Sequence, residues 1–244
     1  MTTREATPLL ARADVTDRKN FWDAAAVMSF GALQWPWLLR SLYGGSAAQK
    51  NRLLERLELA DDALPNLGSW KADAGFLHLI ADTIERDRPA RVVEFGIGAT
   101  SFVIAAALRK WGGSPHIGYD QHDDFVTETN SWLTEHNLSA DLRHAPLGTS
   151  PNGWPGLWYD TGPLDAGIDL MVIDGPPWTV HPFTRGAAEG LFGLLNPGGI
   201  LLLDDASRLG ERLVARQWKR LHPNFEFHLW KGGTKGTLIG RRLY

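Results

Sequence analysis

The stretch Glu94-Phe-Gly-Ile-Gly-Ala-Thr-Ser101 decides the fold of this chain. It follows the apolar Val92 and Val93, which predict a strand, and leads into the apolar, Ala-rich segment Phe102–Leu108, which predicts a helix. Two glycines at a strand-to-helix turn let the backbone approach a ligand and leave amide N–H groups at the helix N-terminus. Nicotinamide dinucleotides use the same geometry, but their fingerprint has a third glycine where this chain has Ser101. The acid before the first glycine favours a ligand that carries an ammonium group.

The chain beyond Asp73 alternates between helical and extended patterns. Short apolar runs bounded by glycine, proline and polar residues predict strands, and apolar residues three and four positions apart predict helices. This alternation, with strands so apolar, predicts a parallel sheet covered by helices on both faces. Strands are expected over 91–95, 116–120, 140–145, 168–173 and 200–203, helices over 76–84, 101–111, 125–136, 185–195 and 209–221, and a closing antiparallel hairpin over 225–241.

The glycine-rich turn and the closing hairpin together resemble one superfamily. The chain resembles the class I S-adenosylmethionine-dependent methyltransferases, whose first motif is acid-x-Gly-x-Gly-x-Thr/Ser and whose last strand is inserted antiparallel. The likeness runs from about Trp70 to Arg241, includes Ile173-Asp-Gly-Pro-Pro177, and points to a bacterial branch with some likeness to the catechol O-methyltransferase-like enzymes. It implies an α/β fold with a Rossmann-like doubly wound sheet, mostly parallel with a C-terminal antiparallel hairpin, and S-adenosyl-L-methionine as cofactor.

Cofactor-binding residues are expected at the ends of the first three strands, because ligands bind beyond the carboxyl ends of strands in open α/β sheets. The backbone of Gly96 and Gly98 would pass the methionine part of the cofactor. The Asp120 carboxylate would accept hydrogen bonds from both ribose hydroxyls, the alternative being an exposed acid at a strand end. Ala145 would lie on one face of adenine. The expected cofactor-binding set is Glu94, Gly96, Gly98, Thr100, Ser101, Asp120, Gln121, Ala145 and Asp174.

Three acids follow the fourth and fifth strands. Asp174 follows the fourth strand, Asp204 and Asp205 follow the fifth, and carboxylates are hard oxygen ligands of the kind that Mg²⁺ prefers. The resemblance implies a similar Mg²⁺ site, in which such acids hold the ion against substrate hydroxyls. The alternative is that the acids cap the helix beginning near Ser207 and pair with Arg208. A Mg²⁺ site at Asp174, Asp204 and Asp205 is therefore an expectation with an open alternative.

A group that takes a proton from the methyl acceptor completes the expected site. The resembling branch has a lysine three residues after its strand-four acid, where this chain has Pro177. Asp174 is one candidate, because the resemblance places this acid opposite the transferring methyl group. His181 lies on the same loop, and an imidazole ordinarily titrates close to neutral pH. Asp174 and His181 are the predicted catalytic residues, with an ordinary surface histidine as the alternative for His181.

Composition narrows the classes of function and partner. A formal net charge of −3 argues against sequence-independent binding of nucleic acid, which normally needs a basic surface. The absence of cysteine excludes disulfides, thiolate metal sites and cysteine nucleophiles. The start of the chain lacks the apolar core of a signal peptide, so the expected location is cytoplasmic. A small-molecule substrate is the expected partner, and Trp154 and Trp158 in the insertion Gly148–Gly167 favour an aromatic one. A homodimer is also an expectation.

Residues 1–66 are predicted to form a helical extension, and residues 67–244 the cofactor-binding domain. The apolar segment Ala24–Leu39 contains Gln34 and Pro36 and is shorter than the roughly 20 residues that a spanning helix needs, so no stable membrane insertion is expected. We expect a buried or lid helix broken at Pro36. A membrane-surface or dimer contact is the alternative.

The sequence as a whole predicts an S-adenosylmethionine-dependent methyltransferase that acts on a small molecule, and the acid cluster favours oxygen as the acceptor atom. Two other functions stay open. A nicotinamide-dependent oxidoreductase would use the same glycine-rich turn, although Ser101 and the closing hairpin argue against it. A non-catalytic S-adenosylmethionine-binding or scaffold protein stays open because the lysine expected after Asp174 is missing.

Overall fold

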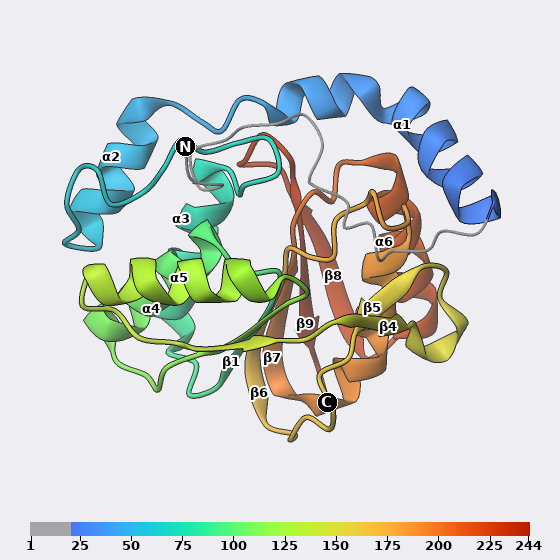
Figure 1. Ribbon diagram of the computed structural model, residues 1–244. Helices are drawn as coiled ribbons and strands as arrows, with labels where there is room; N and C mark the ends of the chain where they lie inside the picture. The colour runs from blue at the N-terminus through green and yellow to red at the C-terminus, as the bar shows by residue number, and fades with distance from the viewer. Residues whose placement is uncertain (1–20) are drawn as a thin grey trace.

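The computed structural model describes residues 21–244 and shows one seven-stranded sheet with helices on both faces (Figure 1). Its strands are Val92–Phe95 (β1), Ile117–Asp120 (β2), Asp141–His144 (β3), Ile168–Ile173 (β6), Leu195–Leu203 (β7), Phe225–Trp230 (β8) and Thr237–Arg242 (β9). The strand order is β3-β2-β1-β6-β7-β9-β8, and β9 runs antiparallel to both of its neighbours while the first five strands are mutually parallel. The predicted fold class, a mostly parallel Rossmann-like sheet with a C-terminal antiparallel pair, is confirmed.

The side chains of the central strands alternate between two separate cores. Val92 and Val172 lie in one core, whereas their neighbours Val93 and Met171 lie in the other. Side chains on a strand point alternately to the two faces of a sheet, so strands covered on both faces need apolar residues at every position. The first core lies under Ala47–Arg56 (α2), Ala74–Asp87 (α3), Ala99–Trp111 (α4) and Asp123–Glu135 (α5), and the second under the 3-10 helix Thr184–Leu194 (η2) and Leu209–Leu221 (α6).

Helix α3 begins where it does because Asp73 caps it. The Asp73 carboxylate accepts the Phe76 N–H at 2.9 Å, as expected of an N-cap residue. The other carboxylate oxygen accepts the N–H groups of Thr234 and Lys235, at 2.8 and 3.1 Å, from the turn between β8 and β9. One side chain therefore holds the C-terminal hairpin against the first helix of the sheet domain.

The first described helix, α1 (Phe21–Ser41), differs from the prediction of a break at Pro36. The helix continues through Pro36. Proline has no N–H, so the Ala32 carbonyl one turn earlier loses its helical donor. Both Ala32 and Pro36 lie on the exposed side of α1, where water can hydrogen-bond that carbonyl, and the helix survives.

Two segments between β3 and β7 also differ from expectation. The insertion after β3 is a small sheet, in which Leu147–Thr149 (β4) pairs antiparallel with Leu157–Tyr159 (β5) around the short 3-10 turn Pro151–Gly153 (η1). The helix expected over 185–195 is the 3-10 helix η2, whose sequence contains three glycines that disfavour an α-helix. Strand β7 begins at Leu195, where it pairs with Ile168, rather than at Ile200.

The predicted boundary between an extension and a domain at residue 66 stays a prediction, and residues 1–20 of that extension lie outside the described residues. Helix α2 shares the core of the sheet domain, since Leu53, Leu54 and Leu57 are fully buried in the same core as Phe76 and Val103. Within residues 21–244, no helix is both long and apolar enough to cross a membrane.

Candidate active site

The turn after β1 is closed by buried polar side chains. The Gly98 N–H donates to Ser101 Oγ at 3.0 Å, and the Ser101 hydroxyl donates to Glu94 Oε2 at 2.6 Å. Nε2 of His116 lies 3.0 Å from the same carboxylate oxygen. Glu94 Oε1 is buried with no hydrogen-bond partner among the described residues. Because buried carboxylate oxygens are normally satisfied, this oxygen has capacity for a donor from a ligand.

The two glycines of this turn serve different steric purposes. A Cβ added to Gly96 would lie 2.5 Å from the backbone nitrogen of Gly175, so Gly96 permits the turn after β1 to touch the turn after β6. A Cβ added to Gly98 would meet only the ring of Phe125, at 3.6 Å. The space for a ligand to approach the backbone, which we predicted for both glycines, therefore lies over Gly98.

We expect Gly96→Ala to lower the free energy of unfolding more than Gly198→Ala does. The two glycines have similar φ, +87° and +83°, so both substitutions carry the cost of a positive φ, about 1–2 kcal/mol. A Cβ at Gly198 meets nothing within 4 Å, whereas at Gly96 it collides with backbone, which adds roughly 1–3 kcal/mol. Urea unfolding followed by circular dichroism measures both. Equal losses would contradict the steric role assigned to Gly96.

Asp120 ends β2 and lies against the turn after β1. Its Oδ2 accepts the Ile97 N–H at 3.4 Å, and its Oδ1 accepts the His122 N–H at 3.0 Å. The residue is 5% exposed, so the alternative of an exposed strand-end acid is wrong. Burial raises the pKa of the Asp120 carboxyl to about 6, even though the His122 N–H bond opposes the shift. Both oxygens keep lone pairs that can accept the two hydroxyls of a ribose.

The predicted cofactor-binding residues Gln121 and Ala145 directly follow β2 and β3, so both lie near Asp120. The N–H of Ala145, which follows β3, donates to the Asp120 carbonyl at 2.8 Å. Gln121 Oε1 is buried and makes no hydrogen bond within residues 21–244. Thr100, at the start of α4, is also buried. The ends of β1, β2 and β3 therefore meet at one edge of the sheet.

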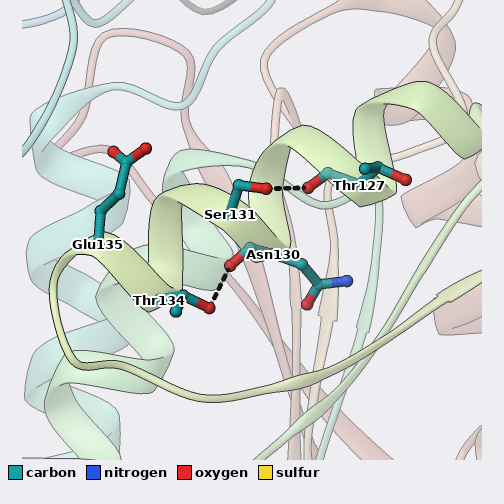
Figure 2. Close-up of a pocket in the computed structure, with 5 residues that line it drawn as sticks. All are labelled: Thr127, Asn130, Ser131, Thr134 and Glu135. Atoms are coloured by element: carbon teal, nitrogen blue, oxygen red, sulfur yellow. Dashed lines mark hydrogen bonds between the residues drawn. The ribbon is translucent and has the colours of Figure 1, made fainter.

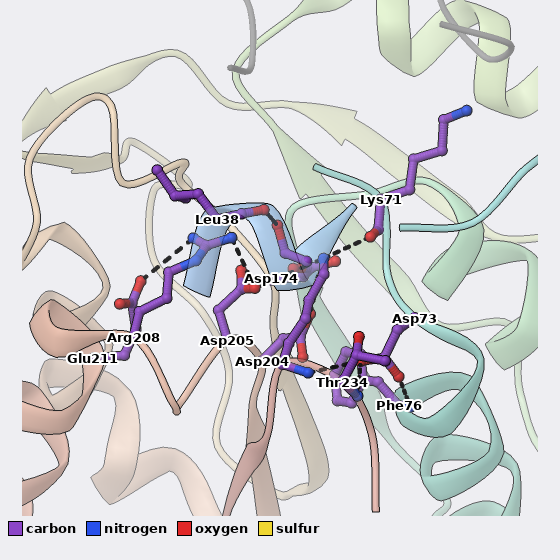
Figure 3. Close-up of polar contacts among 12 residues, drawn as sticks. Leu38, Lys71, Asp73, Phe76, Asp174, Asp204, Asp205, Arg208, Glu211 and Thr234 are labelled. Carbon is purple, nitrogen blue, oxygen red and sulfur yellow. Dashed lines mark hydrogen bonds and ion pairs between the residues drawn. The ribbon is translucent and has the colours of Figure 1, made fainter. Parts of the chain in front are cut away.

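The three predicted acids converge at the ends of β6 and β7 (Figure 3). Asp174, Asp204 and Asp205 each place one carboxylate oxygen within 4.8 Å of the others. Burial raises the pKa of Asp174 to about 7 and the pKa of Asp204 well above its ordinary value. The side chain of Asp174 is 12% exposed, whereas those of Asp204 and Asp205 are 0% and 2% exposed. Asp174 is thus the acid of this trio that a ligand can reach.

Three protein cations surround the acids. Arg185 Nη1 lies 3.1 Å from Asp205 Oδ2, and Arg208 Nη2 lies 2.8 Å from Asp205 Oδ1. Lys235 Nζ, from the turn between β8 and β9, lies 3.7 Å from Asp205 Oδ1 and 3.9 Å from Asp204 Oδ2. Burial alone would raise the pKa of Asp205, but Arg208, Lys235 and Arg185 outweigh it and hold that pKa at about 2.

These cations bear directly on the predicted Mg²⁺ site. Mg²⁺ requires oxygen ligands at about 2.0–2.1 Å in octahedral geometry. Both oxygens of Asp205 already contact guanidinium groups, and the Lys235 ammonium occupies the side of the cluster that Asp204 and Asp205 share. Both oxygens of Asp204 are buried without a hydrogen-bond partner among the described residues, but the three cations around the acids leave the residues as arranged a poor fit for a divalent cation. The predicted convergence of the acids is confirmed, Mg²⁺ binding stays a prediction that this arrangement opposes, and no chemical step below depends on a metal.

His181 contacts α1 rather than this cluster. Its Nδ1 accepts the Phe183 N–H at 3.1 Å, and its Nε2 lies 4.0 Å from Oδ1 of Asp23 in α1. When Nδ1 accepts, the hydrogen of a neutral imidazole is on Nε2, so neither nitrogen offers a lone pair to a substrate. In this arrangement His181 helps α1 pack on the loop after β6, and its role as a base stays a prediction.

Lys235 and Tyr159 are site residues that the sequence analysis does not assign. The Tyr159 hydroxyl is buried, makes no hydrogen bond within the described part of the chain, and lies against the turn after β6, since a Cβ on Gly175 would be 2.0 Å from it. Burial raises the pKa of this hydroxyl well above its ordinary value. The one sequence signal for Lys235 is its place in a tight turn between two terminal strands.

Trp158, which the sequence analysis associates with an aromatic substrate, is buried in the core. It is 4% exposed and packs on Phe95, with ring centroids 5.3 Å apart. Both rings belong to the core between the sheet and η2. A substitution of Trp158 would therefore test core packing rather than substrate contact.

A hollow of about 540 Å³ on the outer surface of α5 is separate from the strand ends (Figure 2). Two of its side chains, Ser131 and Thr134, donate hydrogen bonds to carbonyls of their own helix, those of Thr127 and Asn130. No predicted site residue lines this hollow. We assign it no part in the chemistry.

Comparisons with known proteins agree with this fold. The chain superposes on a methyltransferase from Geobacter sulfurreducens with a TM-score of 0.54, over 89% of this chain and 97% of that one, at 18% identity. It superposes on the SAH-bound methyltransferase PaMTH1 of Podospora anserina with a TM-score of 0.55, over 96% and 100%, at 12% identity. The O-methyltransferase TomG of Streptomyces achromogenes, involved in tomaymycin synthesis and solved with SAM, gives 0.52 over 89% and 98%, at 13% identity.

No protein-family model and no curated protein sequence matches the chain. Identities this low establish the fold alone. The chain therefore has the same Rossmann-like fold as these three methyltransferases, which is the fold that the sequence resemblance implied.

Proposed function

We propose that this protein is an S-adenosylmethionine-dependent methyltransferase that acts on a small molecule. One observation carries the proposal: Asp120 and the glycine-rich turn meet at the ends of β1 and β2, in a sheet whose β9 is inserted antiparallel. A plain dinucleotide-binding sheet does not need that insertion. Three solved structures with this fold hold SAM or SAH, in the words of their descriptions.

The described residues fit this cofactor. The space over Gly98 admits a ligand close to the backbone, and Glu94 Oε1 and Gln121 Oε1 are buried acceptors without a donor among the described residues. Glu94 suits the ammonium group of the methionine part, Asp120 the ribose hydroxyls, and Gln121 a donor on the adenosine part. When bound, the cofactor would supply a methyl group activated by a positively charged sulfur.

Asp174 is the residue that we propose as the proton acceptor. Its pKa of about 7, raised by burial, lies close to the pH at which a general base is most effective. Its side chain is the accessible member of the acid trio, and Arg185 Nη2 lies 3.6 Å from its Oδ1. The carboxylate would hold the proton that an acceptor hydroxyl releases, with Arg185 favouring its ionised form.

Oxygen is the acceptor atom that we propose. An uncharged hydroxyl must lose its proton to become a good nucleophile. The accessible Asp174 carboxylate would accept that proton. Structural neighbours from Streptomyces achromogenes and Bacillus cereus are described as O-methyltransferases, at 13% and 12% identity.

Isothermal titration calorimetry with S-adenosylhomocysteine, NAD and NADP tests the proposal. We expect stoichiometric binding of S-adenosylhomocysteine and no measurable binding of either nicotinamide nucleotide. Binding of NAD without S-adenosylhomocysteine would replace the proposal with an oxidoreductase. Methyl transfer from labelled S-adenosylmethionine to a panel of small hydroxylated aromatic compounds then distinguishes an enzyme from a non-catalytic binding protein. If the Asp174 carboxylate acts as the base, Asp174→Asn should reduce turnover. The affinity of this variant for S-adenosylhomocysteine should stay within a few-fold of the wild-type affinity.

A further inference from the structure

Helix α1 presents a largely apolar face to solvent. It lies along the outside of the molecule, with the rest of the fold on one side of it (Figure 1). Phe21, Trp22 and Met28 are 77%, 77% and 75% exposed, and Trp35 is 58% exposed. Contiguous exposed apolar surface of this kind marks an interaction site on a soluble protein.

Four exposed apolar residues along α1 and just beyond it follow a seven-residue repeat. Phe21, Met28 and Trp35 of α1, and Leu42 one residue past its end, are seven positions apart. We call these four residues the α1 stripe; Trp22, Leu33 and Trp37 are exposed apolar residues outside it. A seven-residue repeat drifts by only about 20° per heptad around a helix, so its members line one side and pack along a second helix. The α1 stripe contains no charged residue.

The α1 stripe is symmetric about its centre, between Gly31 and Ala32. If two α1 helices lie antiparallel across that centre, Phe21 of one copy faces Leu42 of the other, and Met28 faces Trp35. The same two pairs then occur twice, which is the property of a closed two-fold interface. The antiparallel order also places the positive end of each helix dipole beside the negative end of the other.

The exposed area is sufficient for a stable contact. Five aromatic side chains are exposed along and just beyond α1: Phe21, Trp22, Trp35, Trp37 and Tyr43. With an aromatic side chain covering about 200 Å², their exposed fractions amount to roughly 600 Å². Met28, Leu33, Leu39 and Leu42 add to this. A standard interface buries about 800 Å² per partner, which these side chains reach together when the contact also covers Trp22, Leu33 and Trp37 beside the stripe.

We propose that the α1 stripe is the interface through which two copies of this chain form an antiparallel dimer. The charge pattern favours a second copy over a lipid surface, because interfacial helices carry Lys and Arg along their polar face, whereas Asp23 and Arg40 are the charged residues of α1. The opposite side of α1 packs on the loop after β6, where Phe30 contacts Phe183 and Gly31 approaches Trp178. The dimer therefore holds α1 over the loop that carries Asp174.

Sedimentation velocity over a concentration series tests the interface. We expect the full chain to sediment at about twice its monomer mass of 27.0 kDa. The double variant Met28→Glu, Trp35→Glu gathers four carboxylates at the centre of the pair, so its dimer dissociation constant should rise at least about 100-fold. The matched control is Leu213→Glu, Leu221→Glu, which changes two exposed leucines of α6 and should leave the dimer intact.

Disulfide trapping tests the antiparallel order and does not depend on the glutamate variant folding. The chain has no cysteine, so each introduced thiol is unique. We expect Ala32→Cys to cross-link with itself on mild oxidation. The Phe21→Cys variant and the Leu42→Cys variant should each form no disulfide-linked dimer alone. They should cross-link with each other when the two proteins are mixed.

Three outcomes would overturn the proposal. A wild-type chain that is monomeric throughout the concentration series has no such interface. Self-cross-linking of Phe21→Cys as fast as Ala32→Cys would indicate a parallel pair. Sedimentation of a monomer with anionic lipid vesicles, lost in the Met28→Glu, Trp35→Glu variant, would assign the stripe to a membrane surface. All three readings are independent of whether the chain binds S-adenosylhomocysteine.

Discussion

Lys235→Met is expected to destabilise the protein by about 3–5 kcal/mol, because it removes one partner from a buried ion cluster and leaves Asp204 and Asp205 undercompensated. It also opens a place for a divalent cation beside carboxylates that already converge within 4.8 Å. Millimolar Mg²⁺ or Ca²⁺ should therefore raise the Tm of the variant. The wild-type Tm should respond neither to these ions nor to EDTA, because the Lys235 ammonium holds that place. Differential scanning fluorimetry with and without each ion measures both effects.

Lys231→Met is the matched control for this experiment. Lys231 lies in the same turn but is exposed, so its replacement should change neither the Tm nor the response to metal. A stoichiometric Mg²⁺ titration of the wild-type chain would contradict our assignment of Lys235 and restore the metal site that the sequence predicts. So would a Lys235→Met variant as stable as wild type.

Asp120→Asn is expected to weaken S-adenosylhomocysteine binding by about 100-fold or more, since the carboxylate would make two charge-assisted hydrogen bonds worth roughly 1.5–3 kcal/mol each. Asparagine is nearly isosteric and keeps one oxygen to accept an N–H from Ile97 or His122, so the fold should survive. Asp124→Asn, an exposed acid on α5, is the control and should bind like wild type. Calorimetry gives the three affinities. Binding by Asp120→Asn within threefold of wild type would show that Asp120 does not hold the ribose.

The raised pKa of Asp120 adds a pH dependence to the same experiment. Only the ionised carboxylate accepts both hydroxyls, so wild-type affinity should rise as pH increases through about 6 and be roughly tenfold lower near pH 5 than near pH 7. The effect on stability has the opposite sign. Because burial makes folded Asp120 hold its proton more tightly than the unfolded chain, this group costs stability as pH rises from about 4 to 6. The affinity of the Asp120→Asn variant for S-adenosylhomocysteine should not change as the pH passes through about 6.

The parts of the site that the sequence predicts are those fixed by local geometry. A glycine-rich turn between an apolar strand and a helix has few possible backbones, so the placing of Glu94, Gly98 and Ser101 follows from neighbouring residues alone. The position of Asp120 and of the three acids follows from the strand ends, because parallel strands finish at the same edge of a sheet.

The parts that the sequence does not predict depend on contacts between distant segments. Lys235 reaches Asp204 and Asp205 because β9 pairs with β7, and the side-chain pattern of the hairpin does not specify that pairing. The separate roles of Gly96 and Gly98 depend on how closely the turn after β6 approaches, which no local pattern encodes. Pro36 stays inside α1 because the carbonyl it leaves unbonded faces solvent, a fact that the tertiary packing decides.

The place of β9 between β7 and β8 has a consequence for how the chain is made. During synthesis β7 emerges before its partner, so the growing sheet exposes an unpaired strand edge until residues 237–242 arrive. The same late segment delivers Lys235 to the buried acids and the amides that bind Asp73. A ribosome-bound chain that ends before the hairpin therefore has an unpaired edge on β7. Its carboxylates Asp204 and Asp205 also lack the Lys235 ammonium. Completion of the last strand closes the sheet and neutralises the site in one event.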